Sequence, residues 1–173
     1  MPWNNRYKRI VLTGPEATGK TTLANALAER CEGRHVPEYA RTYVEGLGRR
    51  YTRDDVEHIA RVQVRQYEEA EAAGIYPVFF DTFLVITKVW LSVVYGSAPA
   101  WLDAEIRRCA ADLYLLCYPD LPWEPDPVRE NPGIRRIELF TAYQTELERN
   151  GLPLQVITGS NEIRVQNCLA VLE

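Results

Sequence analysis

The sequence predicts a three-layer α/β/α domain, in which helices cover both faces of a parallel sheet. Five short runs of almost purely apolar residues alternate with longer segments whose apolar residues recur at helical spacing. Strands that are buried on both faces are apolar at nearly every position, as these runs are. In addition, a glycine-containing loop directly follows the first run and directly precedes the first helical segment, which is typical of ligand-binding α/β domains.

Each predicted strand ends where the residue type changes to glycine, a carboxylate or another turn-forming residue. The predicted strands, in chain order, are 9–13, 35–37, 77–80, 113–117 and 154–157. Gly14, Glu38 and Asp81 follow the first three strands, and Asp120 comes shortly after the fourth. Because parallel strands present their carboxyl ends at one edge, we expect these residues to lie along a single rim of the sheet.

The helices are predicted from apolar spacing and from end signals. Their expected ranges are 20–30, 52–73, 83–95, 101–109, 134–149 and 161–172. Thr52 and Asp55 form a capping-box pattern at the start of the longest helix, and Gly74 is suited to the left-handed residue that ends it. A proline-rich stretch at 119–132 interrupts the regular pattern.

Length and composition limit the class of protein. With 173 residues, of which 46% are hydrophobic and 25% charged, the chain is expected to form one domain over residues 1–173. A net charge of −4 with interspersed acids and bases argues against a nucleic-acid partner. The longest apolar segment is interrupted by polar residues, which argues against a membrane span. Residues 1–5 lack the apolar core of a signal peptide, so a cytoplasmic location is expected. The spacing of the cysteines and histidines suggests no zinc site.

Residues 14–21, Gly-Pro-Glu-Ala-Thr-Gly-Lys-Thr, match the phosphate-loop pattern GxxxxGK[ST] in full. Backbone N–H groups and the helix N-terminus would bind the phosphates of ATP. Lys20 would reach the β- and γ-phosphates, and Thr21 would ligate Mg²⁺. The alternative is a tight turn that carries these residues by chance. The predicted nucleotide contacts are Gly14, Glu16, Ala17, Thr18, Gly19, Lys20, Thr21 and Thr22.

Two carboxylates near the predicted rim are candidates for the chemistry of phosphoryl transfer. Asp81 ends a buried strand, where it could join Thr21 in holding Mg²⁺ or contact a substrate hydroxyl; the alternative is a helix N-cap. Glu38 could position and deprotonate an attacking hydroxyl, whereas a solvated surface glutamate is the simpler interpretation.

The proline-rich stretch and the arginines that follow it suggest a lid at about 119–136. Arg129, Arg135 and Arg136 lie near a helix start, where the helix dipole does not favour cations, so an anionic ligand would explain them. We take Arg129 and Arg136 as candidate catalytic arginines, the alternative being a solvated helix start. Asp120 could equally be a turn-forming residue. A cationic ring could stack on Trp90 or Trp123, although helical spacing also suits Trp90 to the core.

Several motifs together resemble the ribosylnicotinamide kinase family, the kinase domain found at the C-terminus of NadR-type proteins of bacterial NAD biosynthesis. The motifs are GPEATGKTTLA, DDVEHIA, VPEYAR, FFDT, DLYLLCYPDLPWEPDPVRE and ITG, and they extend from about residue 9 to residue 172. Ala17 departs from the serine expected at that position. Backbone amides bind phosphate there, so this change should matter little.

The resemblance implies an ATP-dependent, Mg²⁺-dependent phosphotransferase that converts nicotinamide riboside to nicotinamide mononucleotide. It also implies the P-loop kinase fold, with strand order 2-3-1-4-5. Glu38 and Asp81 would face the ribose. Tyr39 and Arg41, in the VPEYAR motif, would belong to the substrate site. Trp90, Asp120, Trp123 and Glu124 are the aromatic and acidic residues suited to the pyridinium ring.

Two other functions remain open at this stage. A kinase for another nucleoside or for a mononucleotide would show the same loop, lid and fold. A nucleotide-binding regulatory module would share the loop, although the sequence has no Asn-Lys-x-Asp tetrad for guanine, and an arginine-rich lid suits a kinase better.

Overall fold

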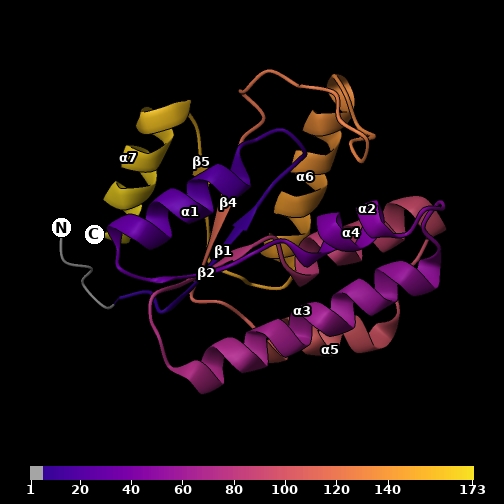
Figure 1. Cartoon of the computed structure of the whole chain (residues 1–173), viewed down its shortest axis with the longest axis horizontal. Helices are drawn as coiled ribbons and strands as arrows, with labels where there is room; N and C mark the ends of the chain where they lie inside the picture. Colours follow the sequence, from indigo (N-terminus) through magenta and orange to yellow (C-terminus); the bar gives the residue numbers. More distant parts are fainter. Residues whose placement is uncertain (1–5) are drawn as a thin grey trace.

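A five-stranded parallel sheet runs through the middle of the protein, in the order β2-β3-β1-β4-β5 (Figure 1). This computed structural model describes residues 6–173. The strands are β1 (Arg9–Thr13), β2 (Arg34–Val36), β3 (Val78–Asp81), β4 (Leu113–Cys117) and β5 (Leu154–Ile157). All four strand pairings are parallel. The predicted fold class and strand order are confirmed.

Helices cover both faces of this sheet. Within the described residues they are α1 (Lys20–Arg30), α2 (Tyr39–Gly46), α3 (Arg53–Ala73), α4 (Leu84–Tyr95), α5 (Ala100–Arg108), α6 (Ile134–Arg149) and α7 (Asn161–Leu172). Ile10 and Leu12 pack in one apolar cluster with α1 and α7. Val11, between them, packs in the other cluster with α3, α4, α5 and α6. Successive residues of β1 thus enter opposite cores, which is why the strand is apolar at each of these positions.

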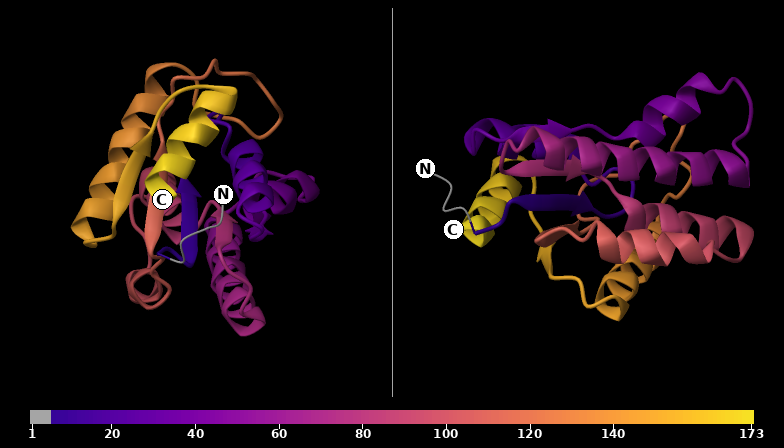
Figure 2. Two further views of the ribbon diagram at one scale, coloured as in Figure 1. Left: turned by 90° about the vertical axis from the view of Figure 1, so that its left-hand side faces the viewer. Right: turned by 90° about the horizontal axis from the view of Figure 1, so that it is seen from below.

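The longest helix begins and ends as its sequence predicts. Thr52 is the N-cap of α3, and its hydroxyl accepts a hydrogen bond from the Asp55 backbone N–H while the Asp55 carboxylate accepts one from the Thr52 N–H. Gly74 follows the helix in the left-handed region, with φ 63°. Both α3 and α4 extend past the end of β1 (Figure 2, right), so they supply walls beyond the strand ends.

One helix was not predicted. α2 follows β2 directly and contains no buried residue. It is only eight residues long, which is shorter than the window over which apolar spacing distinguishes a helix from other structure. It matters for the site because it carries Arg41 and Val44 to the cavity described below.

Within residues 6–173, none of the helices has both the length and the apolar character needed to cross a membrane. The interpretation of residues 1–5 as lacking a signal peptide lies outside the described residues.

Candidate nucleotide and acceptor site

The loop between β1 and α1 forms a cradle with unusual backbone geometry. Gly14 has φ 135°, and a Cβ atom there would lie 2.6 Å from the Cys117 carbonyl oxygen, so only glycine allows this approach of β1 to β4. Ala17 and Gly19 also have positive φ, at 53° and 73°. The Thr18 hydroxyl donates to the Pro15 carbonyl at 2.9 Å and braces the loop from within. Turns of this kind at a helix N-terminus present several N–H groups to an anion.

A buried carboxylate lies beside this cradle. The Thr21 hydroxyl donates to Asp81 Oδ2 at 2.5 Å, and Asp81 is only 1% exposed. Its other oxygen, Oδ1, has no hydrogen-bond partner among the described residues. A buried carboxylate oxygen without a partner is costly, and Mg²⁺ prefers oxygen ligands of this kind together with water and phosphate. The residues present therefore fit a hydrated Mg²⁺. Asp81 is not the N-cap of α4, because Phe83 takes that position.

Glu38 lies at the junction of β2 and α2 and lines the same cavity as Lys20 and Thr21. Burial raises the pKa of its carboxyl, while the nearby Lys20 ammonium acts in the opposite direction. Although Glu38 is the N-cap of α2, its side chain makes no capping hydrogen bond. The carboxylate is therefore not committed to holding the helix and is available to a ligand.

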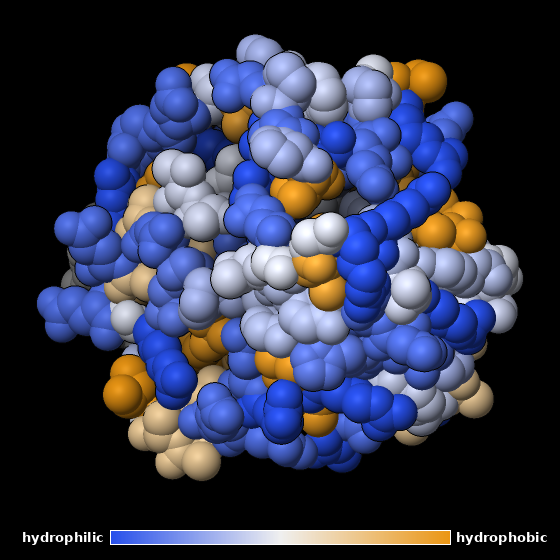
Figure 3. All heavy atoms as spheres, turned by 45° about the vertical axis from the view of Figure 1, so that its right-hand side comes forward, coloured by the Kyte–Doolittle hydropathy of each residue, from blue (hydrophilic) through white to orange (hydrophobic). Residues whose placement is uncertain are grey.

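A cavity of about 330 Å³ connects the phosphate loop to an apolar and aromatic wall. That wall includes Tyr51, Ile86 and Trp90, and the Tyr51 and Trp90 rings meet edge to face with centroids 4.8 Å apart. Trp90 packs against the core and also lines the cavity, so the core interpretation is confirmed and its stacking on a cationic ring stays a prediction. Elsewhere on this side of the molecule, apolar residues reach the surface only in small separate areas (Figure 3).

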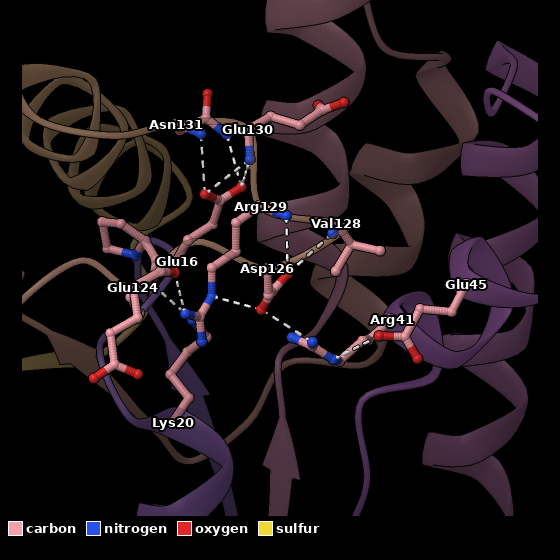
Figure 4. Close-up of polar contacts among 12 residues, drawn as sticks. Glu16, Lys20, Arg41, Glu45, Glu124, Asp126, Val128, Arg129, Glu130 and Asn131 are labelled. Carbon is pink, nitrogen blue, oxygen red and sulfur yellow. Dashed lines mark hydrogen bonds and ion pairs between the residues drawn. The ribbon is translucent and has the colours of Figure 1, made fainter.

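The predicted lid, residues 119–136, contributes Val128, Arg129, Glu130 and Asn131 to the lining of this cavity. Asp126 holds the arginines here: its Oδ2 lies 3.0 Å from Arg41 and 2.9 Å from Arg129 (Figure 4). Its Oδ1 accepts hydrogen bonds from the backbone N–H groups of residues 128 and 129. Sequence reasoning missed Asp126, although an Asp-Pro pair is a known signal for such a turn.

The two other lid arginines differ from Arg129. Arg136 is buried and donates to the carbonyl oxygens of Glu16 at 3.1 Å, Leu121 at 2.8 Å and Ala17 at 3.0 Å. Arg136 therefore holds the backbone of the phosphate loop through its carbonyl oxygens. It does not line the cavity, contrary to the catalytic role predicted for it. Arg135 pairs with Glu138 on the surface.

Four predicted substrate residues lie outside the cavity lining: Asp81, described above, and Asp120, Tyr39 and Trp123. Asp120 accepts a hydrogen bond from the Gly159 N–H at 2.7 Å and pairs with the buried Arg164, which joins it to the start of α7. Tyr39 bonds to His58 on α3 at 3.1 Å. Trp123 lies in the lid, where its buried indole N–H has no partner among residues 6–173. The sequence showed that these residues come near the rim but not which way their side chains point.

We expect Asp120→Asn to lower stability rather than acceptor binding. Arg164 is almost fully buried and also donates to the Thr18 carbonyl at 2.5 Å. Removing the charge of its partner should lower the free energy of unfolding by about 1–3 kcal/mol, measured by urea denaturation. The exposed Asp54→Asn serves as the control. Unchanged stability with a raised KM for the acceptor would instead place Asp120 in the substrate site.

The sheet order and the phosphate loop together define a P-loop nucleotide-binding domain. Residues 9–164 match the family model of the AAA domain (AAA_28), and the chain belongs to that family. Among curated proteins, it is 26% identical over 152 residues to the trifunctional NAD biosynthesis/regulator protein NadR of Escherichia coli K12, an alignment that covers 84% of this chain and 37% of the relative. NadR of Salmonella typhimurium LT2 is 27% identical over 128 residues, covering 70% and 31%.

The chain thus spans about a third of the length of these curated relatives. Among solved structures, NadR in complex with NR superposes with a TM-score of 0.76 at 20% identity, covering 96% of this chain and 51% of that one. Thymidylate kinase from Ehrlichia chaffeensis gives 0.66 at 14% identity, with coverage of 95% and 98%. The resemblance to the NadR kinase family is confirmed by homology, and the solved structures confirm the fold.

Proposed function

We propose that this chain is an ATP-dependent kinase that phosphorylates the 5′-hydroxyl of nicotinamide riboside and releases nicotinamide mononucleotide and ADP. The observation that carries the proposal is that one cavity joins a phosphate loop at one end to an aromatic wall at the other, with Glu38 and Arg129 among the residues that line it. Homology to NadR, and the likeness to NadR solved with NR, support the choice of acceptor.

The donor end would bind the triphosphate of ATP. The backbone of residues 14–19 would hold the phosphates. The Lys20 ammonium, which donates to the Pro15 carbonyl at 2.7 Å, would turn toward the γ-phosphate. Thr21 and Asp81 would hold Mg²⁺. When bound, that ion neutralises charge on the transferring phosphoryl group. No group of three or more His, Cys, Asp or Glu residues suited to another metal occurs in the described chain.

The acceptor end would direct the attacking hydroxyl. Its oxygen forms the new bond to the γ-phosphorus while the bond from that phosphorus to the bridging oxygen of ADP breaks, and the hydroxyl proton passes to Glu38. A carboxylate whose pKa is raised by burial binds a proton more strongly and is therefore a better base, provided that it is ionised. Arg129 would balance negative charge on the transferring group from the lid side.

The aromatic wall suits a flat, positively charged ring. Trp90 and Tyr51 offer π surface, and the Tyr51 hydroxyl donates to Glu130 Oε2 at 2.9 Å, which holds a negative charge near this wall. A pyridinium cation is attracted both by aromatic faces and by a carboxylate. In this proposal Tyr51 and Glu130 bind the pyridinium ring, which is the role that the sequence analysis gave to Asp120, Trp123 and Glu124.

A coupled assay of ADP release tests the proposal, with Mg-ATP and a panel of acceptors. We expect saturable turnover with nicotinamide riboside that greatly exceeds turnover with cytidine, uridine, thymidine and thymidine monophosphate. Faster turnover with another acceptor would keep the kinase mechanism and replace the substrate. ATP binding without acceptor-dependent ADP release would contradict the kinase proposal and favour a regulatory nucleotide-binding module.

A further inference from the structure

Glu16 is a carboxylate within the phosphate loop, and its side chain points toward the lid (Figure 4). Oε1 accepts hydrogen bonds from the Glu130 backbone N–H at 3.0 Å and from the Asn131 side-chain amide at 2.9 Å. Oε2 accepts from the backbone N–H groups of Asn131 at 3.0 Å and of Glu130 at 3.1 Å. Three N–H groups of the lid therefore converge on one carboxylate.

A carboxylate in this loop needs an explanation, because the loop is built to attract phosphate. An unpaired negative charge here would repel the triphosphate, whereas a carboxylate that accepts several N–H bonds has its charge compensated locally. Glu16 is also held at its backbone, because Arg136 donates to its carbonyl oxygen at 3.1 Å. The loop thus anchors the residue and aims its side chain away from the phosphate cradle.

The contact with Glu16 falls directly beside the one lid arginine that lines the cavity. Arg129 immediately precedes Glu130, so the bonds to Glu16 fix the lid backbone on the C-terminal side of Arg129. On the N-terminal side, Asp126 holds the turn through the N–H of Arg129 itself at 3.1 Å. The Glu130 side chain in turn accepts from Tyr51 on the aromatic wall. The segment 129–131 is therefore tied to both ends of the cavity.

We propose that Glu16 is a positioning residue of the reaction: it latches residues 130–131 of the lid onto the phosphate loop and thereby sets Arg129 at the phosphate end of the cavity. The inference rests on the proposed function, since it concerns the same transfer. A latched lid holds the guanidinium where charge develops and keeps water away from the γ-phosphate. In this view Glu16 contributes to turnover without touching the nucleotide, contrary to the nucleotide contact predicted from the motif.

The kinetic test is Glu16→Gln in the full chain, compared with Glu69→Gln, which makes the same charge change at an exposed position on α3. An amide at position 16 would direct its own N–H₂ group at one of the lid donors. We expect kcat to fall about 10- to 100-fold, because a small displacement of a charge-stabilising group has effects of that size. We expect the KM for ATP to change by less than about threefold, because backbone amides bind the phosphates. The ADP formed per phosphorylated product should rise above one as water enters. Glu69→Gln should behave as the unchanged protein.

Hydrogen–deuterium exchange tests the latch without any substrate. The backbone N–H groups of residues 130 and 131 should exchange about 10-fold faster in Glu16→Gln, with the strands unaffected. Unchanged exchange, or unchanged kcat and stoichiometry, would overturn the proposal. Loss of binding of a non-hydrolysable ATP analogue in step with kcat would also overturn it, because Glu16 would then shape the phosphate loop itself. Absence of turnover in the unchanged protein would overturn the proposed function instead, and exchange would still decide whether the latch exists.

Discussion

Glu38→Gln is expected to lower kcat by about 10²–10⁴-fold, with little change in the affinity for ATP. Glutamine has nearly the same shape but cannot accept the proton of the attacking hydroxyl. Glu38 makes no capping hydrogen bond in α2, so the substitution should leave the fold intact. Steady-state kinetics with saturating ATP measure the effect, and Glu69→Gln is the matched control. Little change in Glu38→Gln, combined with loss of turnover in Asp81→Asn, would transfer the role of base to Asp81.

The dependence of kcat on pH provides a second test of Glu38 as the base. Burial raises the pKa of Glu38 above the ordinary value of a glutamate. Because the base works only when ionised, kcat should fall as the pH is lowered through that raised pKa and should reach a plateau above it. In Glu38→Gln this acidic limb should disappear from the pH profile. An unchanged acidic limb in the variant would show that another group is being titrated.

Arg129→Ala is expected to lower kcat by about 10³-fold, the lower end of what an arginine contributes in phosphoryl transfer. Arg129 lines the cavity, and its guanidinium pairs with Asp126, three residues earlier in the same segment. The thermal midpoint and the binding of an ATP analogue should therefore remain close to those of the unchanged protein. Normal turnover in this variant would remove Arg129 from the mechanism.

Arg136→Ala, in contrast to Arg129→Ala, should lower the stability of the protein and its affinity for ATP. Its three bonds to backbone carbonyl oxygens hold the phosphate loop, and the side chain is buried. Their loss should lower the free energy of unfolding by about 3 kcal/mol, measured by urea denaturation, and should weaken ATP binding. Comparing the two variants shows which arginine serves turnover and which serves structure. Equal stability of both would contradict this division.

Prediction from the sequence succeeded where the signal is local. The capping box at Thr52 is confirmed because both of its hydrogen bonds join residues three apart. The strands were recognisable because burial on both faces requires apolar residues at nearly every position. α2 escaped prediction because it is only eight residues long, which is too short for its apolar spacing to identify a helix.

The sequence by itself determined the phosphate loop and the position of Asp81 at the end of β3. Those features depend on glycines, a lysine and a carboxylate at fixed short spacings. Only the tertiary structure decided that Glu16 contacts the lid and that Arg136 lies behind the loop. Glu16 and Asn131 are 115 residues apart in the chain. The lid has no regular repeat that dictates where its side chains point, so their directions follow from the hydrogen-bond partners that folding brings within reach.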